Sequence, residues 1–195
     1  FKDEINDIFT GITRSSNKIK AIVEELKQYS RKDRSIYKSK VEINLVVKSA
    51  LNLLQGMIKT STRDLRVSYK KNLPVLYGNF QNLEQVIINL IQNSCQALTS
   101  KDKSVSISTS FDKTRESIVI EVVDEGSGID EKKLKYIKEP FYTTKRETGG
   151  VGLGLSVSSK IVEEHGGSMN FSSKLNIGTL VRVMLPISGN KHHGE

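Results

Sequence analysis

A glycine cluster is the stretch of this sequence best suited to chemistry. Residues 148–155 read Thr-Gly-Gly-Val-Gly-Leu-Gly-Leu and continue into an apolar, helix-compatible segment that ends near His165. Glycines directly before a helix let several backbone N–H groups converge on an anion, and the helix N-terminus adds partial positive charge. The spacing of Gly150, Gly152 and Gly154 matches neither the P-loop nor the dinucleotide fingerprint. The cluster alone therefore indicates either a phosphate cradle or a flexible loop before a close-packed helix.

Carboxamide side chains follow one face of a segment expected to be helical, capped by Asn79 and running to about Leu98. Asn89 and Asn93, together with a glutamine on either side, recur there at helical spacing among apolar residues. Asparagine is a poor helix former, so two of them one turn apart require another reason. Carboxamide oxygens suit Mg²⁺, which commonly bridges nucleotide phosphates to a protein. The stripe indicates a magnesium and phosphate site, or alternatively a polar face turned toward solvent.

Two further clusters lie between these segments. Asp124 ends a β-like run and is followed by Glu-Gly-Ser-Gly-Ile-Asp. A carboxylate there can accept a hydrogen bond from an adenine amino group, and glycines allow close approach to the base. Guanine carries a carbonyl at that position, so this arrangement favours ATP over GTP. Downstream, Phe141 is expected to act as an apolar peg, and residues 138–149 are expected to form a lid that orders on ATP.

These four blocks, in this order, resemble the N, G1, F and G2 boxes of the sensor histidine kinases. These kinases belong to a wider superfamily of kinases, chaperones, gyrases and mismatch-repair ATPases with one ATP-binding fold. The resemblance covers roughly residues 41–187. It implies that Asn93 is the Mg²⁺ ligand, that Asn89 lies beside the phosphates, and that the Thr179 hydroxyl supports Asp124 and adenine. The residues expected to bind ATP and Mg²⁺ are Asn89, Asn93, Asp124, Gly126, Gly128, Ile129, Tyr142, Thr143, Thr144, Lys145, Gly150, Val151, Gly152, Leu153, Gly154, Leu155 and Thr179.

The acceptor of the γ-phosphate is expected to be a protein side chain. Related ATPases that hydrolyse ATP with water tend to carry a glutamate where Asn89 stands. By the same resemblance the acceptor is a histidine. The phosphohistidine would then donate its phosphoryl group to an aspartate of a response regulator. The phosphoacceptor histidine is expected to be missing from this chain, because His165 resembles a helix-terminal residue and His192 and His193 lie in a polar tail.

The N-terminal residues 1–31 are expected to form a dimerising helix. Seven of eight positions in an alternating three-four spacing from Ile5 to Tyr29 are apolar, with Ser15 in the remaining place. A single helix cannot bury such a face, although packing on its own globular domain is an alternative. By resemblance this is the second helix of a dimerisation and phosphotransfer hairpin, which predicts a homodimer. Residues 32–40 are polar and read as a linker.

The remaining pattern predicts an α+β fold for residues 41–187, followed by a polar tail over 188–195. Strands are expected at 41–43, 65–69, 74–77, 105–111, 118–123, 168–171 and 178–185, and helices at 44–58, 79–98, 130–137 and from the glycine cluster to His165. Asn44 is expected to cap the first of these helices. The result is a two-layer α/β sandwich with a mixed, largely antiparallel sheet and helices on one face.

Composition is consistent with this prediction. The formal net charge is +8, but the basic residues are scattered, which argues against nucleic acid as a partner. No apolar run is long enough to cross a membrane, so no membrane contact by this part of the protein is expected. A cytoplasmic location is predicted, and whether the full-length protein is anchored to a membrane stays open. Cys95 sits in an apolar helical pattern and is expected to be a small buried hydrophobe.

Three other functions fit parts of this pattern. An ATP-gated machine of the gyrase, chaperone or mismatch-repair type would need a catalytic glutamate near Asn89 and a transducer domain. A degenerate nucleotide-binding module could dimerise and regulate a partner. A serine kinase of the anti-sigma-factor type uses a similar nucleotide fold, but the long heptad helix favours the histidine kinase.

Overall fold

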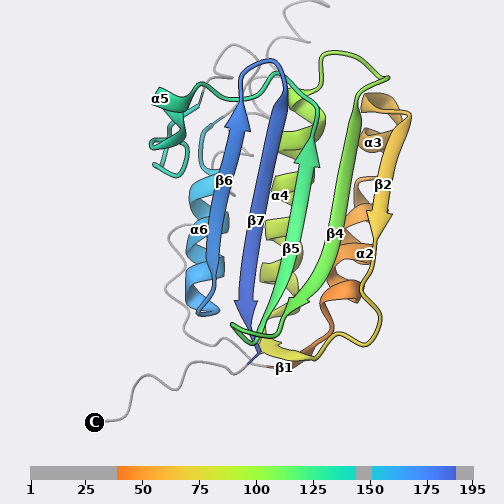
Figure 1. Cartoon of the computed structure of the whole chain (residues 1–195), viewed down its shortest axis with the longest axis vertical. Coiled ribbons are helices and arrows are strands. Elements are labelled where there is room, and N and C mark those ends of the chain that lie inside the picture. The colour runs from red at the N-terminus through yellow and green to blue at the C-terminus, as the bar shows by residue number, and fades with distance from the viewer. Residues whose placement is uncertain (1–38, 144–150, 188–195) are drawn as a thin grey trace, which may run out of the picture.

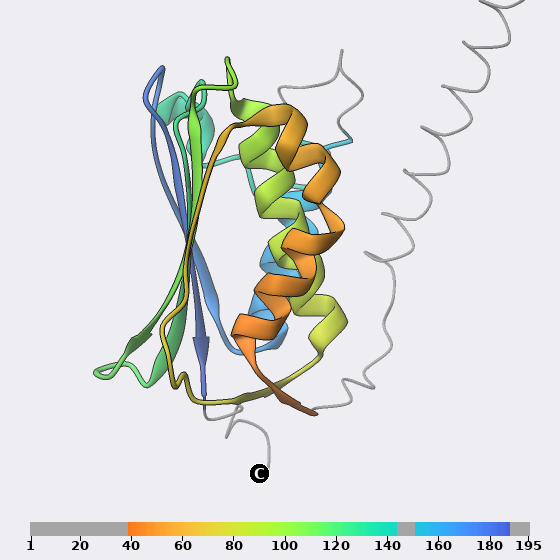
Figure 2. The ribbon, with the colours of Figure 1, turned by 90° about the vertical axis from the view of Figure 1, so that its right-hand side faces the viewer.

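The computed structural model describes residues 39–143 and 151–187, which form a sheet layer and a helix layer. The longer helices lie on one face of the sheet, the short helix over 131–134 lies beside one edge, and no helix of the described residues covers the other face (Figures 1 and 2). The predicted two-layer sandwich is therefore confirmed. The dimerising helix predicted over residues 1–31 lies outside the described residues, as does the polar tail.

The main sheet has five strands in the order β2-β4-β5-β7-β6. Only β2 and β4 pair in parallel, and the other three pairings are antiparallel, which confirms the predicted mixed sheet. A separate two-stranded ribbon pairs β1 with β3 antiparallel. The bounds are β1 Ser39–Val41, β2 Asp64–Ser68, β3 Leu76–Gly78, β4 Ser104–Asp112, β5 Ser117–Asp124, β6 Ser168–Lys174 and β7 Gly178–Pro186.

Alternation along the central strand β5 explains how the layers meet. Ile118, Ile120 and Val122 belong to the hydrophobic core under the helices, whereas Val119, Glu121 and Val123 alternate with them on the other face and lie outside that core. A period of two therefore gives the sheet one apolar face, and the helices cover it.

The helices are α2 Ile43–Leu53, α3 Gln55–Ser61, α4 Phe80–Ala97, α5 Glu131–Leu134 and α6 Gly154–Glu164. Helix α4 lies behind the middle of the sheet, with Ile87, Leu90 and Ile91 almost completely buried (Figure 1). The predicted cap is confirmed, because the Asn79 side chain accepts a hydrogen bond from the Asn82 N–H at 2.9 Å. In the described ranges 39–143 and 151–187 no helix is both long and apolar enough to span a bilayer.

The first helix differs from the prediction in two ways. Asn44 is not its cap: the helix begins at Ile43, whose side chain is drawn into the core, and Glu42 precedes it without a side-chain cap. The Asn44 side chain instead donates to the Lys70 carbonyl at 3.0 Å and accepts from the Thr109 hydroxyl at 2.8 Å. The predicted single helix is also interrupted at Leu54, where the backbone leaves helical geometry for one residue.

Three other elements differ in extent or place. The first strand begins at Ser39, inside the range expected to be a linker, and ends at Val41 because Ile43 enters the helix. The segment predicted as an edge piece pairs with this strand and not with the main sheet. The charged helix expected over 130–137 is only the four residues of α5, capped by Asp130.

Candidate functional site

Several predicted motifs meet at one end of the molecule. The last residues of β5 and α4 and the β6–β7 hairpin lie at this end, and α6 begins below it, beside the middle of α4 (Figure 1). Two backbone hydrogen bonds tie the turn after β5 to its neighbours: the Ser127 N–H donates to the Ala97 carbonyl at 2.9 Å, and the Asn176 N–H donates to the Ser127 carbonyl at 2.7 Å. The turn is therefore fixed between the end of α4 and the hairpin.

Asp124 is the buried acidic residue of this end. Its side chain is on the helix-covered side of the sheet, in the same alternation as Val122, and the residue is only 5% exposed. Its carboxylate accepts a hydrogen bond from the Gly126 N–H at 2.9 Å. A buried carboxylate is costly unless donors surround it, so the position is suited to a group that presents an N–H.

Three glycines around Asp124 are required by close packing. A Cβ on Gly126 would meet the Ala97 carbonyl oxygen at 2.6 Å, and one on Gly128, which has φ +67°, would meet the Lys174 carbonyl oxygen at 2.1 Å. Gly178 has φ +142°, and its Cβ would lie 1.9 Å from the Asp124 carbonyl oxygen. The predicted glycine turn thus packs backbone against backbone.

Thr179 lies opposite Asp124 in the β5–β7 register, and Ser173 lies opposite Thr179 in the β6–β7 register. The hydroxyl oxygens of Thr179 and Ser173 are 2.9 Å apart. Ser173 also accepts a hydrogen bond from the Ile129 N–H at 2.8 Å, which holds the far end of the glycine turn. The described contacts of Thr179 are therefore with Ser173, and the expected support of Asp124 by its hydroxyl is untested.

Asn89 joins α4 to the first turn of α6. Its amide nitrogen donates to the Gly154 carbonyl and to the Ser158 hydroxyl, both at 3.1 Å. Its amide oxygen accepts a hydrogen bond from Gln85 at 2.8 Å. Asn93 lies one turn further along the same helix and is half-buried. The carboxamide stripe is therefore turned toward α6 at Asn89, and it is not a solvated face there.

The start of α6 offers backbone donors beside this stripe. The helix has 11 residues and Leu153 at its N-cap, with no side-chain cap. Leu153 is 0% exposed, so its side chain belongs to the core, and the partly buried Val151 and Leu155 pack against that core. These three side chains fix the loop, which leaves anion contact to the backbone N–H groups of the helix terminus.

The segment before the glycine cluster corrects one prediction. Phe141 is not a buried peg: it is 52% exposed and has φ +67°. Its backbone provides the anchor, because its N–H donates to the Gly152 carbonyl at 3.0 Å. A Cβ on Gly152, which has φ +80°, would meet the carbonyl carbon of Phe141 at 2.6 Å and the carbonyl oxygen of Tyr142 at 2.7 Å.

The rest of this segment is described only in part. The Tyr142 ring lies 5.9 Å from that of Tyr136, and Thr143 is half-buried. Thr144, Lys145 and Gly150 lie outside the described residues, and so does most of the predicted lid.

His165 has a structural role. It ends α6, is 9% exposed, and its Nδ1 lies 2.7 Å from the Ile161 carbonyl oxygen. Its Nε2 accepts a hydrogen bond from the Asn79 N–H at 3.0 Å, so the proton of the neutral ring is on Nδ1. Both ring nitrogens are engaged in contacts within the domain, and the prediction that His165 is not the phosphoacceptor stays a prediction.

Cys95 is 5% exposed and unpaired with another cysteine, as predicted. Burial raises the pKa of its thiol, which keeps the side chain in the neutral, unreactive form.

Sequence reasoning assigned no individual role to three residues that hold these elements together. Ser173 and Ser158 are single serines in stretches rich in serine, so no spacing distinguished them. Lys138 donates from its ammonium group to the Met169 carbonyl at 2.6 Å and lies 5.6 Å from the centre of the Phe171 ring. It holds the residues after α5 to the edge strand β6, and no local pattern predicts that contact.

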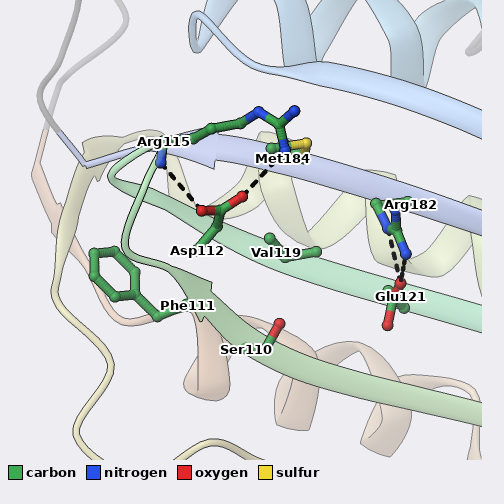
Figure 3. A pocket seen from close by; sticks show the side chains of 8 residues that line it. All are labelled: Ser110, Phe111, Asp112, Arg115, Val119, Glu121, Arg182 and Met184. Carbon is green, nitrogen blue, oxygen red and sulfur yellow. Dashed lines mark hydrogen bonds and ion pairs between the residues drawn. The ribbon is translucent and has the colours of Figure 1, made fainter.

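A pocket of about 250 Å³ lies away from this end, on β4, β5, β7 and the β4–β5 turn (Figure 3). Its two guanidinium groups are paired with carboxylates: Arg115 with Asp112 at 3.2 Å and Arg182 with Glu121 at 2.6 Å. These pairs compensate the charges of the pocket, and none of its residues belongs to a predicted motif.

Comparison with known proteins gives consistent matches. A family model described as "Histidine kinase-, DNA gyrase B-, and HSP90-like ATPase" matches residues 78–189. Sporulation kinase C of Bacillus subtilis (strain 168) is 33% identical over 190 residues, which cover 97% of this chain and 42% of that protein. Sporulation kinase E of the same organism is 30% identical over 182 residues, which cover 93% of this chain and 24% of that protein.

A solved structure, the catalytic domain of histidine kinase ThkA, aligns with a TM-score of 0.67 at 25% identity. The alignment covers 77% of this chain and 95% of that domain. The chain thus spans less than half of the two sporulation kinases but almost all of a catalytic domain.

Proposed function

This chain belongs to the family of histidine kinase-, DNA gyrase B- and HSP90-like ATPases, and we propose that it supplies the phosphoryl-donating step of a sensor histidine kinase. In this proposal the γ-phosphate of Mg·ATP passes to a histidine on another segment and then to a response-regulator aspartate. The observation that carries it is a buried Asp124 and its glycine turn at one end of the fold, with the carboxamide stripe of α4 joined through Asn89 to the α6 N-terminus on the same helix-covered side.

The base would bind at Asp124. The carboxylate is buried at the end of a central strand, where it accepts a hydrogen bond from the Gly126 N–H. An adenine amino group would give it a further donor, and a guanine carbonyl would set an acceptor against it. Asp124, with the surrounding residues 126–129 and Thr179, would therefore select ATP.

The phosphates would lie between α4 and the start of α6. The backbone N–H groups of the first α6 turn have no side-chain cap, and they would donate to phosphate oxygens. Asn89 holds this turn against α4 through Gly154 and Ser158. Tyr142 and Thr143 precede this loop and would border the same phosphates.

A magnesium ion would be held by Asn93 together with the phosphates. No cluster of three or more His, Cys, Asp or Glu side chains suited to a metal occurs within residues 39–143 and 151–187. A carboxamide oxygen fits an ion that keeps most of its ligands as phosphate and water oxygens. When bound, Mg²⁺ neutralises phosphate charge and aligns the γ-phosphate for in-line attack.

The remaining assignments extend this proposal to the whole chain. Residues 1–31 would form the second helix of a dimerisation hairpin, residues 32–40 would link it to the ATP-binding domain over 41–187, and residues 188–195 would be a tail. Partners would then be a second copy of the chain and a receiver domain. The seam of seven apolar positions supports the first, and similarity to named kinases supports the second.

Calorimetric titration with a non-hydrolysable ATP analogue tests the proposal. Micromolar binding corresponds to about −8 kcal/mol. We expect Asp124→Asn to abolish it and Asn93→Ala to remove its dependence on Mg²⁺. Glu125→Gln is the matched control, because that neighbouring carboxylate is exposed and accepts a hydrogen bond from the Ser104 N–H. The affinity of this variant for the analogue should stay at the wild-type value. Absence of binding by the wild type would refute the proposal and favour a dimerising module without nucleotide.

A further inference from the structure

Ser173 connects the parts of the end that would bind the base. Asp124, Thr179 and Ser173 form one row across β5, β7 and β6, because each lies opposite the next in the strand register. Asp124 and Thr179 follow the same alternation as the core residues of their strands, and Ser173 follows that of Phe171, which packs against the core. The row is therefore on the helix-covered face.

The hydroxyl of Ser173 contacts three groups. It accepts a hydrogen bond from the Ile129 N–H at 2.8 Å, donates to the Gly178 carbonyl at 2.9 Å, and lies 2.9 Å from the Thr179 hydroxyl oxygen. The side chain of its neighbour Ser172 is on the opposite face of the sheet and is exposed. Among these two adjacent serines, Ser173 alone faces the row.

The proton count of a hydroxyl determines what Thr179 can do. A serine hydroxyl has one proton and two lone pairs. Ser173 gives its proton to Gly178 and one lone pair to Ile129, so the contact with Thr179 requires Thr179 to be the donor. The Thr179 oxygen then keeps its lone pairs, which can accept a hydrogen bond from a ligand N–H.

We propose that Ser173 is a specificity-determining residue of the base site, which orients the Thr179 hydroxyl so that it accepts from a 6-amino purine. This inference rests on the proposed function, since it assigns Thr179 and Asp124 to base binding. Both would then accept hydrogen bonds, which favours an amino group over a carbonyl at the 6-position. Ser173 acts through Thr179 and through the Ile129 backbone, so it is a positioning residue.

The test compares two nucleotides that differ at the 6-position. Affinities of the full chain for ATP and for inosine triphosphate, which carries a 6-carbonyl, are measured by calorimetry with Mg²⁺. We expect Ser173→Ala to lower the ratio of the two affinities about tenfold, the equivalent of one net hydrogen bond, because the Thr179 hydroxyl becomes free to rotate and donate. Ser173→Thr keeps a hydroxyl and should restore the ratio, and Ser172→Ala should leave it unchanged.

The outcomes separate this role from packing and from the proposed function. An equal loss of affinity for both nucleotides would mean that Ser173 only holds the turn, which overturns the inference, and so would an unchanged ratio. If Ser173→Ala does not fold, Ser173→Cys, which is similar in size but a weak donor and acceptor, replaces it with the same expectation. Wild-type protein that binds neither nucleotide would refute the proposed function itself.

Discussion

Replacing His165 by asparagine tests whether its ring joins the two helices of the candidate phosphate site. The His165 Nε2 is the acceptor for the Asn79 N–H, and a shorter asparagine side chain cannot reach that donor. An amide N–H left without an acceptor in a buried position costs about 1–3 kcal/mol. Glutamine is long enough to place an amide oxygen near the position of Nε2, so most of that loss should be avoided in His165→Gln.

The magnitude can be measured by thermal unfolding. For a domain of this size each kcal/mol shifts Tm by roughly 2–4 °C. A loss of about 2 kcal/mol in His165→Asn should therefore lower Tm by roughly 4–8 °C. The Tm of His165→Gln should lie at least half-way back toward that of the wild type, and the Tm of His165→Ala should be close to that of the asparagine variant. Equal stability of the asparagine and glutamine variants would refute the assignment of Nε2 as the acceptor.

Two further predictions concern a glycine and a carboxylate at the same end as Asp124. Gly178→Ala should destabilise the fold by about 3 kcal/mol or more in urea unfolding, because φ is +142° and the new Cβ would lie 1.9 Å from the Asp124 carbonyl oxygen. Gly56→Ala is the control: a Cβ there would have nothing within 4 Å, so this variant should be as stable as the wild type or more stable. The Ser104 N–H donates a hydrogen bond to the Glu125 carboxylate and lowers the pKa of that group. This hydrogen bond should therefore stabilise the fold above the ordinary pKa of a glutamate, and the stabilisation should be lost as the pH falls through the lowered pKa. The difference in Tm between wild type and Glu125→Ala should accordingly shrink in acid, and a difference that grows there would contradict this sign.

The fold was predictable because local pattern and tertiary packing agree over most of the chain. Strands β4 and β5 place their core residues at every second position, and Asn79 caps α4 as its residue type predicts. The errors arose where packing overrides a local signal. Asn44 is an acceptable cap, but burial of Ile43 moves the helix start, and the asparagine pairs with Thr109 across 65 residues of sequence.

The candidate site divides in the same way. Residue type and spacing predicted Asp124, Asn89 and the glycines as site residues, and their binding roles stay predictions. Ser173 could not be selected, since its importance comes from register between β6 and β7 and not from its neighbours in sequence. Phe141 was misplaced for a related reason: an aromatic residue in a polar segment predicts burial, whereas here the backbone makes the contact with Gly152.

The two halves of the candidate site are held by different kinds of interaction. The base side is fixed by strand register and by glycines packed against backbone carbonyls, with Gly178 against Asp124. The phosphate side depends on how α6 lies along α4, and both ends of α6 are joined to that helix, Gly154 to Asn89 at its middle and His165 to Asn79 at its N-cap. Because these junctions are separated by the length of α6, a change at His165 should reach the phosphates only through the helix as a rigid element. Under the proposed function, small shifts of α6 would therefore move the γ-phosphate while the base contacts at Asp124 stay in place.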